Sequence, residues 1–128
     1  MKLNAVGVSS KDIRKSVEFY RLLGFEFPEF TNEDRHVESV NNTGSKLMLD
    51  HVSMVKEILG TEPIPSNHSN FCIQYDTPAE LDEAVDKLIK GDYTVVKSPW
   101  NAFWGQRYAV VKDPDGYMVD LYAYLKKD

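Results

Sequence analysis

The strongest constraint on the fold is a pattern of predicted elements that occurs twice in the chain. Each half of the sequence indicates a strand, then a helix, then three further strands, and the two predicted helices end at Gly24 and Gly91. Capping sequences precede both helices, the segment 10–12 (Ser-Lys-Asp) in the first half and Thr77 before Pro78 in the second. The 128 residues therefore predict one α+β domain made of two βαβββ modules, with no room for a separate catalytic domain.

The predicted elements also set the module boundaries. In the first module, strands are expected at residues 3–9, 25–30, 37–40 and 46–51, with a helix at 13–23 and a turn at 41–44. In the second module, strands are expected at residues 71–75, 93–97, 107–112 and 117–124, with a helix at 78–90 and a turn at 113–116. A short helix and a proline-containing segment separate them. We expect module one over residues 1–52, a connector over 53–67 and module two over 68–128.

Strand alternation sorts the side chains into two faces, because successive residues point to opposite sides of a sheet. One set is uniformly apolar and is assigned to the helix side: Val6, Val8, Leu47, Leu49, Phe71, Ile73, Val119 and Leu121. The other set is mixed: Ala5, Gly7, Met48, Asp50, Asn70, Cys72, Gln74, Met118, Asp120 and Tyr122. This mixed face is either a plain solvated surface or a concave surface for a ligand. We favour the ligand surface, because Met48, Met118 and Cys72 are unusual choices for open water.

Composition and charge exclude several classes of protein. The net charge of −5 disfavours nucleic acid and anionic membranes as partners, since both require a basic surface. The single cysteine, Cys72, excludes an intramolecular disulfide and every metal motif built from paired cysteines. No apolar run approaches the roughly 20 residues of a membrane helix, and we expect a cytoplasmic protein. No arrangement of Ser, His and Asp or of Cys and His predicts a nucleophilic site, so no catalytic residue is assigned.

Aromatic residues concentrate in the segment 98–108. Trp100, Phe103 and Trp104 fall within five residues, and Tyr108 follows in what is predicted to be the start of a strand. Rings in a loop either plug the core beneath it or line a ligand site, and both interpretations remain open at this point. Arg107 is the one strong cation near this loop, and it is expected to pair with a carboxylate of a ligand or of Asp120.

The sequence resembles the vicinal oxygen chelate superfamily, which includes glyoxalase I, the bleomycin and fosfomycin resistance proteins and extradiol dioxygenases. In the first half, the similarity lies in residues 5–8 (Ala-Val-Gly-Val), 12–13, 16–20 (Ser-Val-Glu-Phe-Tyr) and 22–25 (Leu-Leu-Gly-Phe). In the second half, it lies in residues 104–107 (Trp-Gly-Gln-Arg), 113–117 (Asp-Pro-Asp-Gly-Tyr) and 120–121. The resemblance implies that the two modules form an eight-stranded cup, that the cup holds a ligand or a metal, and that the protein is a homodimer.

Enzymes of this superfamily hold a divalent metal with four side chains, mostly His, Glu and Gln. By resemblance, the equivalent positions here are Ala5, Met48 (or Asp50, if the register slips), Asn70 and Asp120. Only an aspartate among them is a conventional ligand for a hard divalent ion. The three histidines are interpreted as polar residues outside the site: His36, His51 and His68. We therefore predict no metal and no cofactor.

These observations predict a metal-free binding protein that sequesters an aromatic or cationic antibiotic or metabolite. The predicted ligand-binding residues are Met48, Asp50, Trp100, Phe103, Trp104, Arg107, Tyr108, Asp120 and Tyr122. Two alternatives remain: a metal-dependent enzyme, such as a glyoxalase-like lyase or isomerase, a dioxygenase or a thiol transferase, and a noncatalytic module whose cup is filled by its own side chains.

Overall fold

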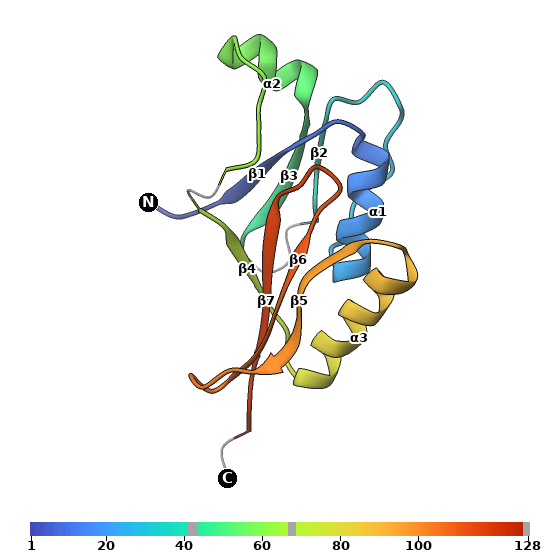
Figure 1. Ribbon diagram of the computed structural model, residues 1–128. Coiled ribbons are helices and arrows are strands. Elements are labelled where there is room, and N and C mark those ends of the chain that lie inside the picture. The colour runs from blue at the N-terminus through green and yellow to red at the C-terminus, as the bar shows by residue number, and fades with distance from the viewer. Residues whose placement is uncertain (41–43, 67–68, 127–128) are drawn as a thin grey trace. The chain divides into compact units, whose positions relative to one another are not determined.

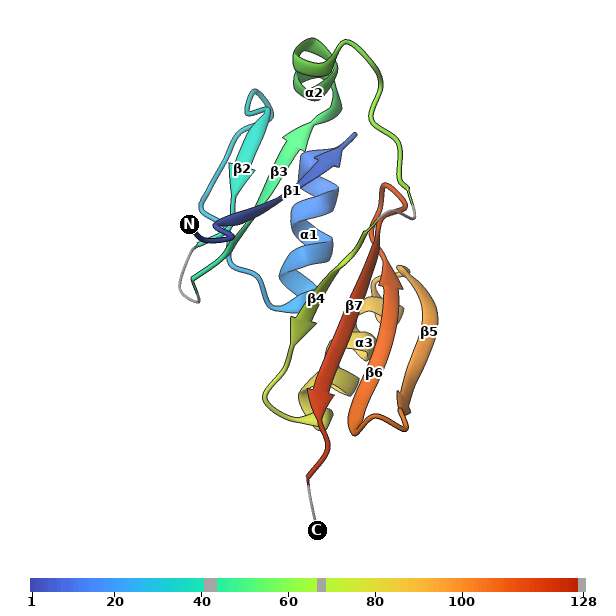
Figure 2. The ribbon, with the colours of Figure 1, turned by 90° about the vertical axis from the view of Figure 1, so that its left-hand side faces the viewer.

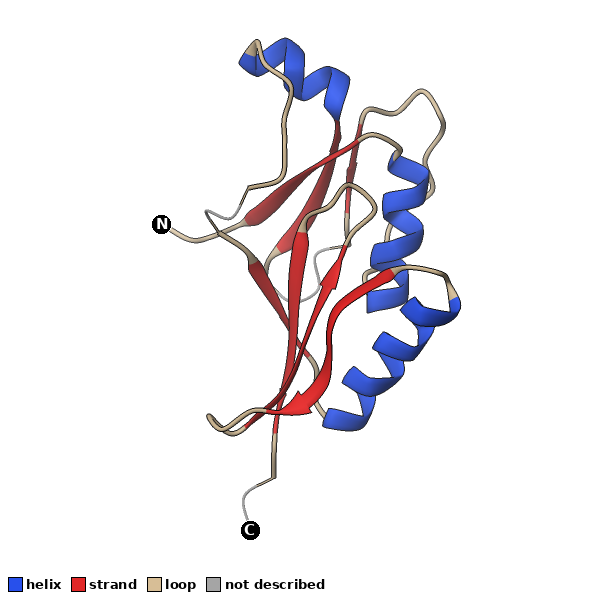
Figure 3. Cartoon of the chain, viewed as in Figure 1, coloured by secondary structure: helices blue, strands red, loops and turns tan. Residues whose placement is uncertain are grey.

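A computed structural model describes residues 1–40, 44–66 and 69–126. The chain divides into two compact units, Met1–Pro65 and Ser66–Asp128. Each unit joins a β-sheet to a helix that covers one face of it (Figure 3). The α+β fold class expected from the sequence is thereby confirmed. No helix in the described parts of the chain is both long and apolar enough to cross a membrane.

The first unit contains a three-stranded sheet. Along the chain it consists of β1 (Ala5–Ser10), α1 (Ile13–Leu23), β2 (His36–Glu38), β3 (Lys46–His51) and α2 (Val52–Leu59). The strand order is β1-β3-β2, with β1 parallel and β2 antiparallel to β3 (Figure 1). Helix α1 packs against β3, and its buried apolar residues are Ile13, Val17, Phe19, Tyr20 and Leu23. Leu47 and Leu49 of β3 are 2% and 0% exposed, so this face of the sheet is core.

The segment expected to form a second strand of this unit, residues 25–30, is not a strand. Pro28 lies in its middle and has no N–H group to donate to a strand ladder. The segment forms one ladder-like bond, from the Val40 N–H to the Glu26 carbonyl at 2.8 Å. Aromatic packing holds the remainder of this segment in place. Phe27 is buried, and the rings of Phe25 and Tyr20 make an edge-to-face contact with their centroids 5.9 Å apart. The predicted turn at 41–44 lies mostly outside the described residues.

The second unit contains a four-stranded sheet. Its elements are β4 (Phe71–Gln74), α3 (Pro78–Lys90), β5 (Thr94–Asn101), β6 (Gln106–Lys112) and β7 (Met118–Tyr124). The order is β4-β7-β6-β5, and α3 packs against β5, β6 and β7 (Figure 2). Val119 and Leu121 of β7 are fully buried on the α3 side, as alternation predicted. We call the opposite side of this sheet the open face.

Strand β5 is longer than the sequence indicated. It continues through Trp100 and Asn101, so much of the predicted aromatic loop is strand, and only a short turn connects it to β6. The ladder with β6 is irregular on both sides of Lys97. This irregularity accommodates Pro99, which cannot donate a backbone hydrogen bond.

Gly24 offers a test of how the predicted helix ends contribute to stability. Its φ of 115° lies in the left-handed region, and a Cβ added there would meet no atom within 4 Å. We expect Gly24→Ala to lower the free energy of unfolding by about 1 kcal/mol through backbone strain alone. Gly7→Ala is the matched control, because Gly7 lies in β1 and its added methyl group would make ordinary contacts at 3.7–3.8 Å. Urea unfolding in which both variants lose the same stability would contradict this assignment.

Candidate functional site

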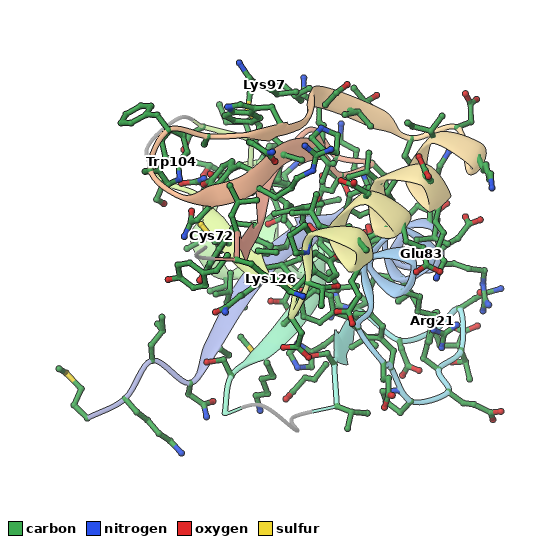
Figure 4. The ribbon with its side chains drawn as sticks, turned by 90° about the horizontal axis from the view of Figure 1, so that it is seen from below. Arg21, Cys72, Glu83, Lys97, Trp104 and Lys126 are labelled. Carbon is green, nitrogen blue, oxygen red and sulfur yellow. The ribbon has the colours of Figure 1, made fainter. Side chains whose placement is uncertain are left out.

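The open face of the second sheet carries two rows of side chains across its strands. The backbone register aligns Gln74, Tyr122, Tyr108 and Trp100 in one row, from β4 to β5. It aligns Cys72, Asp120, Val110 and Lys97 in the next row. The first row is mostly aromatic, and the second row carries two charged side chains, Asp120 and Lys97. Figure 4 shows Cys72 and Trp104 on one side of this sheet and Glu83 of α3 on the other.

The rings of this face form a continuous cluster. Tyr108 is its centre, with ring centroids 5.5 Å from both Trp100 and Trp104 in edge-to-face contacts. Tyr122 lies nearly parallel to Tyr108 at 6.3 Å and contacts Tyr124 edge-on. Edge-to-face and offset contacts are the favourable geometries for aromatic rings. We call Trp100, Trp104, Tyr108, Tyr122 and Tyr124 the aromatic face.

Part of this aromatic surface is accessible. Trp104 is 48% exposed and Phe103, in the turn between β5 and β6, is 97% exposed. Phe103 contacts the Trp104 ring at 5.0 Å and so extends the cluster outward. The Trp104 Nε1 donates to Oε1 of Gln106 at 2.8 Å, which fixes the indole orientation without a ligand. The sequence left open whether the rings of this segment fill the core or line a ligand site. Phe103 and Trp104 are too exposed to fill the core.

Asp120 is held by the aromatic face. The Tyr108 hydroxyl donates to Oδ2 of Asp120 at 2.5 Å, while Cys72 Sγ lies 4.0 Å from the same hydroxyl. Burial, reinforced by the hydrogen bond to the Asp120 carboxylate, raises the pKa of Tyr108. The phenol therefore keeps its proton and acts as a donor that positions the carboxylate. In the same way Tyr122 donates to Oε1 of Gln74 at 3.2 Å.

Arg107 does not belong to this face, which corrects the sequence interpretation. Its Nε and Nη2 donate to the two carboxylate oxygens of Asp82, on α3, at 2.9 and 3.3 Å. Its Nη1 donates to Asn101 at 3.0 Å. Because Arg107 precedes Tyr108 in β6, alternation places it on the helix side of the sheet. It ties β6 to α3 and does not pair with Asp120.

The face of the first sheet opposite α1 carries a polar cluster that sequence reasoning missed. His36 lies opposite Asp50 in the β2–β3 register, and its Nδ1 contacts that carboxylate. Its Nε2 lies 2.8 Å from Oε2 of Glu38, whose other oxygen pairs with Lys46. The predicted residues Met48 and Asp50 lie on this face, and Asp50 is engaged by His36. The signal available in the sequence was the alternate spacing of His36 and Glu38 in one short strand.

The His36 cluster makes part of the stability depend on pH. Hydrogen bonds to Glu38 and Asp50 raise the pKa of His36 above its ordinary 6.5, because both ring nitrogens must donate. Protonated His36 therefore stabilises the folded state fully below about pH 6. This stabilisation is lost as the pH rises through the raised pKa of His36 in the folded protein. We therefore expect His36→Gln to destabilise the protein more at about pH 5.5 than at about pH 8.5. Denaturant unfolding at both pH values measures this, and an equal or larger loss at high pH would contradict it.

The metal positions implied by the resemblance do not supply a suitable donor set. Ala5 has no donor atom, the Met48 thioether is too soft for a hard divalent ion, and Asn70 offers only an amide. Asp120 accepts from Tyr108, and Asp50 contacts His36. Within residues 1–40, 44–66 and 69–126, no three His, Cys, Asp or Glu side chains are placed to hold a metal ion together. The residues present therefore do not fit the metal centre of the superfamily's enzymes.

Comparison with known proteins connects this geometry to a family. The family model described as "Glyoxalase/Bleomycin resistance protein/Dioxygenase superfamily" matches residues 2–121. The chain is 28% identical over 130 residues to the "Uncharacterized protein YraH" of Bacillus subtilis, covering 98% of this chain and all of that protein. A glyoxalase-related enzyme from Fulvimarina pelagi superposes with a TM-score of 0.80 at 18% identity, covering 95% of this chain and 87% of its own.

A second solved structure shows the same fold. A glyoxalase/bleomycin resistance protein/dioxygenase family enzyme from Burkholderia phytofirmans superposes with a TM-score of 0.79 at 20% identity, covering 98% of this chain and all of its own. At these identities the two structures establish the fold, while the family model covers nearly the whole sequence and confirms the resemblance seen in its motifs. The chain belongs to the glyoxalase/bleomycin resistance protein/dioxygenase superfamily.

Proposed function

We propose that this protein binds and sequesters a small aromatic or cationic molecule, an antibiotic or a metabolite, without a metal ion. The observation that supports this most directly is the aromatic face, where ring contacts of 5.5–6.3 Å join Trp100, Tyr108, Trp104 and Tyr122. A preformed cluster of partly exposed rings provides stacking surface at little conformational cost. The family membership agrees with a small-molecule ligand.

Binding is favoured over catalysis by how the polar groups are used. Asp120 is a charged group beside the ring of Tyr108, whose hydroxyl donates to its Oδ2 at 2.5 Å. Tyr108 keeps its proton because its pKa is raised, so its hydroxyl is not available as a phenolate that could act as a general base. The side chains that surround the rings thus position one another, as expected for a recognition surface.

Fluorescence titration tests the proposal, because both tryptophans of the chain belong to the aromatic face. The metal-depleted protein is titrated with 2-naphthalenemethanol, a neutral aromatic probe, and a free tryptophan analogue is titrated in parallel to correct for absorption by the probe. We expect saturable quenching with one probe per chain. Quenching that is linear and identical for the protein and the free analogue would contradict the proposal and would favour a face that binds no small molecule.

The metal-dependent alternative rests on Asp120, which by the resemblance stands at a metal-ligand position of the superfamily's enzymes and which lies on the open face. In that case the protein would be a glyoxalase-like lyase or isomerase, a dioxygenase or a thiol transferase. Metal dependence of an activity, together with its loss in Asp120→Ala, would favour this alternative over sequestration.

A further inference from the structure

An irregularity in β5 places the side chain of Lys97 beside the aromatic face. Its Nζ lies 4.5 Å from the centroid of the Trp100 ring. The two residues are three positions apart in β5, so regular alternation would place them on opposite faces. The register instead pairs Lys97 with Val110 and Trp100 with Tyr108, which lie two positions apart in β6 on the same face. One extra residue in β5, a bulge, therefore brings the ammonium group onto the ring.

The charges around the rings favour an anion. Asp120, a carboxylate on this face, keeps its negative charge, and its Oδ2 accepts a hydrogen bond from the Tyr108 hydroxyl. Arg107 is on the helix side with Asp82. Lys112 lies in register with Met118 at one end of the open face. Within residues 69–126, Lys97 and Lys112 form no ion pair with a carboxylate. The open face therefore carries two lysines against the one carboxylate of Asp120, and Lys97 is the lysine that lies against a ring, although the protein has a net charge of −5.

We propose that Lys97 determines the charge of the ligand and that the aromatic face takes a small aromatic acid. The ligand ring stacks on the cluster beside Trp100, and its carboxylate pairs with the Lys97 ammonium group. An aromatic cation is disfavoured for two reasons: it must displace Lys97 from the Trp100 ring, and the displaced ammonium group stays nearby and repels it. This inference rests on the proposed function and narrows its aromatic or cationic guest to an aromatic anion.

Three probes of the same shape but different charge test this inference by calorimetry on metal-depleted protein: 2-naphthoate, 2-naphthalenemethanol and 2-naphthylmethylammonium. We expect the wild-type protein to bind naphthoate about five- to tenfold more tightly than the neutral alcohol, and the ammonium probe most weakly. In Lys97→Gln, naphthoate should lose most of this advantage and the ammonium probe should bind more tightly. The affinity for the neutral alcohol should change less than about twofold, and Lys97→Arg should retain the preference for naphthoate.

Lys90→Gln is the matched control, because it removes the same charge from the end of α3, on the other side of the sheet. It should leave the order of the three probes unchanged. If the alcohol binds saturably but Lys97→Gln and Lys90→Gln affect the charged probes equally, the inference is wrong and the proposed function stands. If none of the three probes binds saturably to the wild-type protein, the proposed function is wrong and the inference fails with it.

Discussion

Trp100→Ala is expected to weaken the binding of 2-naphthoate about 5- to 30-fold, which corresponds to about 1–2 kcal/mol. The substitution removes a ring that contacts both Trp104 and Tyr108 and also the surface on which the Lys97 ammonium group rests. The expected loss of affinity thus has two causes: less ring surface for stacking, and a Lys97 ammonium group that is no longer held in place by the Trp100 ring. Calorimetry is the suitable measurement, because the variant also loses one of the two fluorescent reporters.

Phe30→Ala is the control for this substitution. It removes an aromatic ring of the first unit that is covered by the Arg14 guanidinium group at 4.9 Å. We expect its affinity for naphthoate to equal that of the wild-type protein, at a temperature where thermal unfolding shows both variants to be folded. Equal affinities of Trp100→Ala and wild-type protein would exclude the aromatic face as the ligand site.

Leu121→Ala is expected to produce the largest loss of stability among the single changes considered, about 2–5 kcal/mol. Leu121 lies in β7, between β4 and β6, and is fully buried. Alanine leaves a cavity beneath α3 that the surrounding strands cannot close without breaking their ladder hydrogen bonds. Chemical denaturation monitored by circular dichroism measures the change.

Met118→Ala separates the two faces of the same strand. Met118 is also in β7, but its side chain lies on the open face and is 43% exposed. We expect it to cost less than about 1 kcal/mol, since the truncation removes atoms that are partly in water. A loss as large as that of Leu121→Ala would mean that the assignment of core and open faces is incorrect.

The faces of the strands were predictable because they follow from alternation alone. Leu47 and Leu49 of β3 and Val119 and Leu121 of β7 were assigned to the core, and each is at most 2% exposed. Helix ends were also predictable, because capping depends on a few adjacent residues. The Asp12 side chain accepts from the Lys15 N–H, and the Thr77 side chain accepts from the Glu80 N–H.

Features that depend on pairing with another strand were not predictable. The bulge that brings Lys97 beside Trp100 is invisible in the local pattern, which assigns these residues to opposite faces. The role of His36 depends on its register with Asp50, fourteen residues away in the chain. Such pairings are set by long-range packing, which a single sequence does not specify.

Arg107 is a different case, because alternation was sufficient to place it. Its neighbour Tyr108 was expected at the ligand site, so Arg107 had to point to the helix side. Its positive charge near an aromatic loop suggested a ligand contact instead. Two hydrogen bonds to Asp82 show that the charge serves the packing of α3 on β6. Geometry should therefore take precedence over charge when a candidate ligand contact lies within a strand.

Under the proposed function, the aromatic face binds its ligand without a metal ion. The most direct test is calorimetric titration of 2-naphthoate into chelator-treated protein, and into the same protein after addition of nickel, zinc, manganese or iron(II), with the metal content determined by mass spectrometry. We expect one naphthoate per chain, with the same affinity in every sample and no stoichiometric metal. One tightly held ion per chain, with binding lost when that ion is removed, would contradict it.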